Sequence, residues 1–165
     1  HSFPTRRSSD LRLNDVFDYT SDSLLVAQIQ RCIDYCDAMI ASIKSASASI
    51  KIGICVTIPP NDSQDAFGKA YGCGQTRNRY KRNNLLWAKR LIAEYDNRET
   101  DAIYLVPIHT NLDTVYNMGI ETLPVNARNT VVTYESPISN GGVHPVESGY
   151  WQIADVYTAF LKAQA

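Results

Sequence analysis

The sequence lacks a long apolar run, a strong charge imbalance and a closely spaced set of cysteines. No stretch approaches the roughly 20 consecutive apolar residues that a transmembrane helix needs, so we expect no membrane span. The formal net charge is -1 and the cations are dispersed except at 77–82, which does not indicate a nucleic-acid-binding surface. The four cysteines lack the paired spacing of a zinc site, so we expect structural thiols.

The composition that is present is that of a globular protein. The 165 residues are 44% hydrophobic and 20% charged, which is typical of one domain or of a large piece of one. No charged-then-apolar leader opens the chain, although the native start is uncertain. The compartment and the oligomeric state are therefore left open.

The first eleven residues differ in character from the rest of the chain. They read HSFPTRRSSDL, are dense in arginine and serine, and show neither helical nor strand periodicity. They are also the in-frame translation of a widely used sequencing-library adapter. Such segments are excluded from fold reasoning. We interpret residues 1–12 as a non-native, adapter-derived segment, and we expect residues 13–165 to be the C-terminal part of a single domain.

Hydrophobic periodicity predicts alternating helices and strands. The expected order is a helix at 23–44, a strand at 50–58, a helix at 77–95, a strand at 102–108, a short strand at 130–134 and a helix from 147 or 148 to 162. Polar loops follow the strands. This order predicts an α/β fold of three layers, α/β/α, around a parallel sheet. Because only two strands are strong, the sheet is expected to be incomplete at its N-terminal side.

Two details of burial follow from the same pattern. The apolar run at 50–58 predicts a strand buried on both faces. The last helix is expected to bury one apolar face, made of Ile153, Val156, Tyr157, Phe160 and Leu161. The polar loop at 61–75 is long, and long loops at strand ends are frequently functional.

Two short motifs lie where an open α/β sheet collects its reacting groups, near the carboxyl ends of strands. Asn14 and Asp15 precede the first helix, and His144 stands in a glycine-rich turn before the last. The chain resembles the SGNH (GDSL-type) hydrolase family, whose third block is Gly-x-Asn-Asp and whose fifth is Asp-x-x-His-Pro followed by Gly-Tyr and a helix. Here the third block has Arg12 at its glycine position, and the fifth matches His144-Pro145 followed by Gly149-Tyr150.

The resemblance implies roles for two residues. His144 would be the general base that takes the proton from a serine hydroxyl, and Asn14 would donate its amide N–H to the oxyanion. A helix cap or Asx turn is the structural alternative for Asn14, as an ordinary turn histidine is for His144. The nucleophile block of the family precedes the third block, so the serine is absent from this chain. Ser8 and Ser9 belong to the adapter-like segment, and the chain as written is expected to be inactive.

The residue that would orient the imidazole is not identified by the sequence. Gly141 stands where the family has an aspartate. Asn140, Glu135, Glu147 or a backbone carbonyl are the alternatives, and the choice decides between a Ser-His dyad and a triad. A further histidine, His109, ends the second strong strand and is interpreted as structural or as lining a pocket.

The family resemblance implies ester hydrolysis through a serine ester intermediate, without a metal and without an organic cofactor. The expected partner is a small-molecule, lipid or O-acetylated carbohydrate ester, and the aromatic and polar loop at 59–75 suits a sugar slightly better than an acyl chain. The alternative is a catalytically lapsed domain of the same kind that binds carbohydrate or a protein. A flavodoxin-like nucleotide binder would need a glycine-rich phosphate loop, which is not visible in residues 13–165.

Overall fold

The alternation of helices and strands produces a parallel pair of strands, as predicted. The computed structural model describes residues 15–63, 76–138 and 142–165. In it, β1 (Ile52–Cys55) and β2 (Ile103–Val106) pair in parallel, with Ile52 opposite Ile103 and Cys55 opposite Val106. Helix α3 (Arg77–Tyr95) lies in the connection between the two strands. Helix, strand and crossover are the features of an α/β fold.

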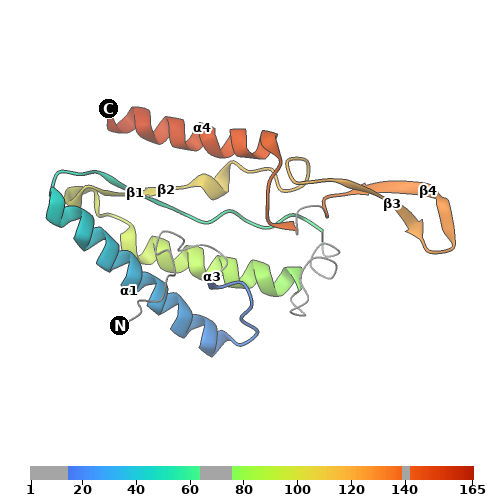
Figure 1. Ribbon diagram of the computed structural model, residues 1–165, viewed down its shortest axis with the longest axis horizontal. Helices are drawn as coiled ribbons and strands as arrows, with labels where there is room; N and C mark the ends of the chain where they lie inside the picture. The colour runs from blue at the N-terminus through green and yellow to red at the C-terminus, as the bar shows by residue number, and fades with distance from the viewer. Residues whose placement is uncertain (1–14, 64–75, 139–141) are drawn as a thin grey trace, which may run out of the picture.

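Helices lie on both sides of the strand pair (Figure 1). Helix α1 (Asp22–Ala46) and α3 lie together on one side, and α4 (Glu147–Gln164) lies alone on the other. The bounds of α3 are those that the sequence predicts, and α1 and α4 begin within one residue of the predicted start and end two residues beyond the predicted end. The mixed helix and strand content and the small parallel sheet agree with the α/β part of the expected fold class.

The larger hydrophobic core lies between α1, α3 and the strands. It contains Leu25, Ile29, Cys32, Ile33, Cys36, Ile40, Trp87, Leu91, Tyr95 and Ile103. The three- and four-residue spacings on α1 put its members on one face of that helix. Leu25 is fully buried, which contributes roughly 1.5–3 kcal/mol relative to an exposed side chain.

Helix α4 packs closely against the opposite face of the strand pair. A Cβ atom added to Gly53 would lie 2.9 Å from Val106 Cγ2 and 3.0 Å from Phe160 Cε1. Phe160 also meets Tyr104 edge to face, with ring centroids 5.9 Å apart. The absent side chain at Gly53 therefore lets α4 approach β1.

The two strong strands are shorter than predicted. The run at 50–58 forms a strand only at Ile52–Cys55, and Ile50 is exposed. The N–H of Val56 still donates to the carbonyl of Val106 at 3.0 Å, but Pro59 and Pro60 follow and have no N–H to continue a ladder. The expectation of burial on both faces is wrong for this segment, because Gly53 is exposed and its neighbours are half-buried.

Helix α4 also buries less than predicted. Ile153 is 9% exposed, whereas Tyr157 and Leu161 are 39% and 64% exposed. Among the described residues the parallel sheet has two strands, so only a narrow strip of α4 faces it. Tyr157 still reaches β1 with its hydroxyl, which lies 2.9 Å from Cys55 Sγ.

A β-hairpin extends from the layers of helices and strands (Figure 1). The sequence predicts only part of it. Strand β3 (Glu121–Asn126) pairs antiparallel with β4 (Asn129–Ser136), of which only 130–134 is expected from the pattern. Pro124 argues against a strand when the sequence is read alone. The turn is fixed by the Asn126 side-chain oxygen, which accepts hydrogen bonds from the N–H groups of Arg128 and Asn129, both at 2.9 Å.

Candidate functional site

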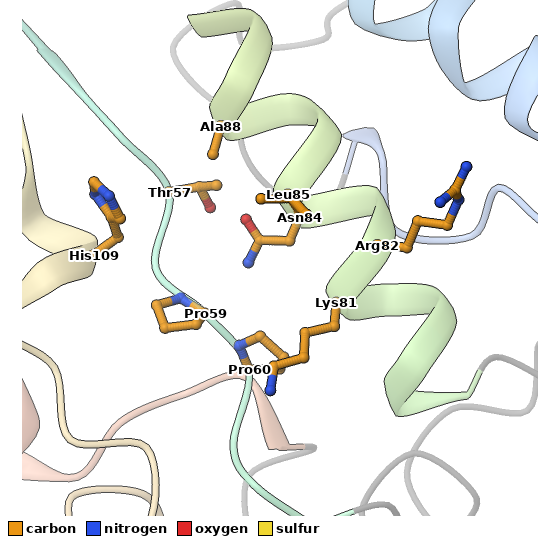
Figure 2. Close-up of a pocket in the computed structure, with 9 residues that line it drawn as sticks. All are labelled: Thr57, Pro59, Pro60, Lys81, Arg82, Asn84, Leu85, Ala88 and His109. Carbon is orange, nitrogen blue, oxygen red and sulfur yellow. The ribbon is translucent and has the colours of Figure 1, made fainter. Parts of the chain in front are cut away.

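A cavity of about 410 Å³ opens beyond the carboxyl end of β1. Figure 2 shows it between residues 57–60 of the chain leaving β1, the N-terminal half of α3 and His109. His109 lies on the 3-10 helix η3 (Ile108–Thr110), which follows β2. The carboxyl ends of both parallel strands therefore lead into the walls of this cavity, which is where ligands bind in open α/β sheets.

His109 carries a polar atom that nothing in the described part of the chain satisfies. Its Nδ1 is buried and has no hydrogen-bond partner there. Desolvation by burial lowers the pKa of the imidazole below its ordinary value, which favours the neutral ring near neutral pH. The sequence leaves His109 as structural or pocket-lining, and the structure places it in the cavity wall.

The stretch that carries His144 is fastened to the same end of the sheet. The N–H of Asn61, in the chain leaving β1, donates to the carbonyl of Gly142 at 2.9 Å. On its other side the N–H of Val146 donates to the carbonyl of Asn117 at 3.1 Å, and Pro145 forms an isolated bridge with Met118. Gly142 has φ 73, a left-handed conformation that favours glycine.

Gly149 explains why α4 can start so close to this stretch. A Cβ atom there would lie 2.6 Å from the carbonyl oxygen of Asn117 and 2.7 Å from Pro145 Cβ. The hydroxyl of Ser148 donates to Asn117 Oδ1 at 2.8 Å, which holds the first turn of the helix against the same asparagine. The glycine of the Gly149-Tyr150 pair thus serves close packing at the turn that carries His144.

The imidazole of His144 itself is exposed. Within residues 15–63, 76–138 and 142–165 it forms no hydrogen bond and no ion pair. Glu147 lies in the first turn of α4 and Glu135 lies on β4, and neither carboxylate pairs with His144 in that part of the chain. The other proposed orienting residue, Asn140, and the glycine at 141 lie outside the described residues.

Asn14 also lies outside the described residues, but the segment that follows it is firmly held. Asn83, fully buried on α3, donates through Nδ2 to the carbonyls of Val16 at 3.0 Å and Tyr19 at 2.9 Å. Arg79 Nε donates to the same Tyr19 carbonyl at 2.9 Å. The turn between Asn14 and α1 is therefore held through its backbone.

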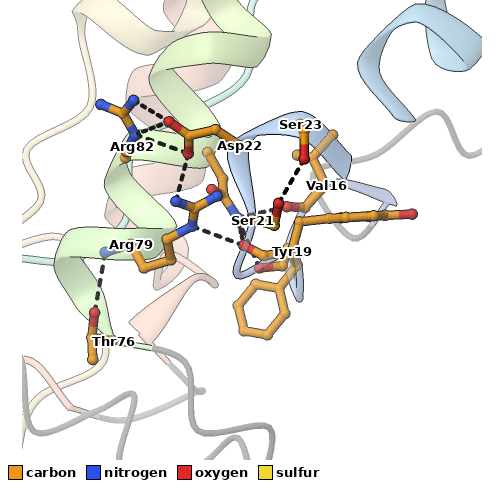
Figure 3. A network of polar contacts seen from close by, with 10 residues as sticks. Val16, Tyr19, Ser21, Asp22, Ser23, Thr76, Arg79 and Arg82 are labelled. Atoms are coloured by element: carbon orange, nitrogen blue, oxygen red, sulfur yellow. Dashed lines mark hydrogen bonds and ion pairs between the residues drawn. The ribbon is translucent and has the colours of Figure 1, made fainter. Parts of the chain in front are cut away.

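An ion-pair network fixes the start of α1 to α3 beside this turn (Figure 3). Arg79 Nη1 lies 2.6 Å from Asp22 Oδ1, and Arg82 binds the other oxygen of the same carboxylate. The hydrogen bonds from Arg82, then those from Arg79, lower the pKa of Asp22 to about 2. Two cations of the run at 77–82, Arg79 and Arg82, therefore hold the start of α1.

A small hydrophobic cluster joins the two predicted motif regions. Tyr80 and Ile138 form its buried centre, and Phe17 and Val143 both pack against it. Phe17 meets Tyr80 edge to face, with ring centroids 5.0 Å apart. Phe17 is three residues after Asn14, and Val143 directly precedes His144. The structure therefore brings the neighbourhoods of both predicted site residues to one cluster.

Among the described residues the cysteines are free thiols and the possible metal ligands are dispersed. Among them no group of three or more His, Cys, Asp and Glu residues could hold a metal ion. Cys32 and Cys36 are buried free thiols, as the sequence predicts, and desolvation raises the pKa of Cys32 to about 11. Cys73 lies outside the described residues. No helix in the described ranges is both long and apolar enough to cross a membrane.

Three residues that support the site were not identified from the sequence. Asn61, Asn83 and Asn117 each connect loops through backbone or amide hydrogen bonds. Asparagine is common in ordinary loops and turns, so a single sequence carries no signal that separates these three from the rest.

The chain was compared with protein-family models, with curated proteins and with solved structures. None of these comparisons finds a match.

Proposed function

We propose that this chain carries the base-bearing and oxyanion-hole segments of an SGNH-type serine ester hydrolase, built on a flavodoxin-like sheet. The observation that supports this most directly is the shared cluster of Tyr80 and Ile138, against which Phe17 and Val143 pack. It brings the segment after Asn14 and the turn before His144 to the same place. Gly142, beside Val143, is also bonded to Asn61 in the chain that leaves the carboxyl end of β1, the end of a parallel sheet that holds reacting groups.

In the proposed reaction His144 acts as general base and then as general acid. Its neutral imidazole takes the proton from a serine hydroxyl while the serine oxygen attacks the ester carbonyl. It then gives that proton to the leaving alcohol as the tetrahedral intermediate collapses to a serine ester. Water, which gives a proton to His144, then attacks the serine ester. The acid product leaves, and the imidazole returns the proton to the serine oxygen. The exposure of His144 is consistent with this role because a base must be reachable by nucleophile and substrate.

Asn14 supplies the oxyanion stabilisation in this proposal. An amide N–H aimed at the developing negative charge typically contributes roughly 2.7–4 kcal/mol to the barrier reduction. The backbone of the segment from Val16 to Tyr19 is held by Asn83 and Arg79, which gives the neighbouring amide a rigid base. Rigid support of this kind is what electrostatic preorganisation requires.

The proposal favours a Ser-His dyad in which Asn140 or a backbone carbonyl orients the ring. Within the described residues neither Glu135 nor Glu147 forms an ion pair with His144. Gly141 replaces the aspartate of the family at the position that would complete a triad. Orientation by a neutral group stabilises the imidazolium less than a carboxylate does, so turnover below that of a full triad is expected.

The nucleophile has to come from outside residues 13–165, because these residues contain no Gly-Asp-Ser segment. The proposal places it in native coding sequence upstream of Leu13, where residues 1–11 have the adapter sequence. The substrate class is an ester of a small molecule, a lipid or an acetylated sugar. No metal and no organic cofactor is required by this chemistry.

Hydrolysis of a p-nitrophenyl ester by protein that carries the native upstream segment tests the proposal. We expect release of p-nitrophenol that disappears when the serine of the Gly-Asp-Ser-like segment is replaced by alanine. Equal rates for the two proteins would exclude the enzyme. The unpaired imidazole of His144 and the glycine at 141 favour one alternative, a lapsed domain that binds carbohydrate or protein through the surface around His144. That alternative predicts ligand binding with no serine-dependent hydrolysis.

A further inference from the structure

The cavity beside residues 57–60 has mostly apolar walls. Pro59 and Pro60 line it on the strand side, and Leu85 and Ala88 line it on the α3 side (Figure 2). Its volume of about 410 Å³ is within the usual range for small-molecule sites, roughly 300–1,000 Å³. Leu85 is 59% exposed although its side chain is large and apolar. An apolar ligand group lying here would cover that surface.

Two polar groups in the wall have no partner in the described part of the chain. The Lys81 ammonium forms no ion pair there, whereas its neighbour Arg82 is bound to Asp22. The buried Nδ1 of His109 has no hydrogen bond. A third polar side chain, that of Asn84, already has a hydrogen-bond partner, because its Nδ2 donates to the carbonyl of Ile58. The cavity wall thus holds an unpaired cation, together with a half-buried imidazole whose Nδ1 is shielded from solvent.

We propose that this cavity binds a small amphipathic carboxylate, with its apolar body against Pro59, Pro60 and Leu85 and its anionic group at Lys81. An ammonium at the mouth selects for negative charge, and the apolar walls select for an alkyl or aromatic body. Lys81 and His109 line the same cavity, so both lie beside a ligand that occupies it.

The proposal does not depend on the esterase activity, because all of its residues lie in the described chain and none belongs to the proposed catalytic set. A carboxylate is favoured over a neutral ligand because Lys81 has no internal counter-charge among the described residues. A cationic ligand is disfavoured by the same ammonium. The affinity of the cavity is therefore expected to depend on the charge of the ligand.

The full 165-residue protein is titrated with an anionic, a neutral and a cationic ligand that share the same six-carbon alkyl group, which tests the charge that the cavity prefers. Hexanoate, hexan-1-ol and hexylammonium are added in turn near neutral pH, and the ring Cε1–H of His109 and the methyl of Ala88 are followed by NMR. We expect hexanoate to move both signals and to bind roughly fivefold or more tightly than hexan-1-ol. Hexylammonium is expected to bind most weakly. Equal affinities for the three probes, or no movement of either signal, would overturn the proposal.

Two matched variants on one helix locate the charge. Lys81→Met removes the ammonium at the cavity and keeps most of the apolar stem, and Lys89→Met removes one from α3 outside the cavity lining. The first should lower the hexanoate affinity to about that of hexan-1-ol, and the second should leave it unchanged. Equal losses in both variants would show a non-specific effect of net charge and would also contradict the site. If Lys81→Met fails to fold, the comparison of the three probes on the unmodified chain decides.

Discussion

The N–H of Asn61 donates to the carbonyl of Gly142 at 2.9 Å, which ties the chain leaving β1 to the turn that carries His144. The bond joins two backbones, so it does not depend on the identity of either side chain. Asn117 holds the other side of the same turn through its carbonyl and its side chain. The proposed base thus lies on a loop that is held at two points, which suits a residue that must keep one geometry.

The first prediction concerns the packing behind that loop. Gly149→Ala should destabilise the protein by roughly 1–3 kcal/mol, because the new Cβ would meet the Asn117 carbonyl oxygen and Pro145. Urea unfolding followed by circular dichroism measures the change. Thr158→Ala, at an exposed position of the same helix, is the control and should stay within about 0.5 kcal/mol of the parent. In an unconstrained helix glycine to alanine is stabilising, so a rise in stability would contradict the close contact.

The second prediction concerns acid stability. The arginines lower the folded-state pKa of Asp22 to about 2, below its ordinary value of 3.8. A carboxylate with a depressed pKa stabilises the fold above its unfolded-state pKa, and this stabilisation is lost as the pH falls from about 4 to about 2. Asp22→Asn should therefore be less stable than the parent near pH 6, and the difference should shrink toward pH 2. Asp155→Asn, at an exposed position of α4, is the control and should stay within about 0.5 kcal/mol of the parent near pH 6.

The convergence is read from urea midpoints of the parent and Asp22→Asn across that pH range. A difference between the two proteins that stays constant from about pH 6 to about pH 2 would mean that the carboxylate contributes by packing alone. Raised salt should reduce the difference near pH 6, because the Asp22 carboxylate and Arg82 are partly exposed to solvent.

The third prediction concerns the thiols. With a pKa of about 11, Cys32 holds roughly one part in a thousand as thiolate near pH 8, and it is also buried. Iodoacetamide should leave Cys32 unmodified in the folded chain and alkylate it in urea, as read by peptide mass spectrometry. Cys55 is the internal comparison, because it is less buried than Cys32. Labelling of Cys32 at the same rate with and without urea would show that the α1–α3 core is open.

The helices of this fold could be predicted from sequence because each has a clear apolar period. Helix α3 has the predicted bounds, and Leu25, Ile29 and Ile33 on α1 are buried as expected. The hairpin was only partly predictable, because Pro124 lies inside β3 and the exposed strands have no apolar alternation. Leu161 was predicted to be buried and is exposed, because periodicity identifies an apolar face without stating what covers it.

The candidate site could be predicted from the sequence only where a local pattern of residues marks it. His144 before a glycine-containing helix start is a local pattern that one sequence can show. The hydrogen bond between Asn61 and Gly142 joins distant backbones, and neither residue type reveals its partner in a single sequence. The burial of His109 Nδ1 is likewise a property of the folded chain that residue type does not show. These features require coordinates.

The central claim is that His144 is the base of an ester hydrolase, and a pair of histidine variants tests it most directly. In protein that carries the native upstream serine segment, kcat/KM for p-nitrophenyl acetate is measured for His144→Gln and His109→Gln. Loss of a general base typically lowers the rate by roughly 10²–10⁴, so His144→Gln should lose at least about a hundredfold while His109→Gln stays within about threefold of the parent. Unchanged hydrolysis in His144→Gln, with the serine still required, would contradict the account.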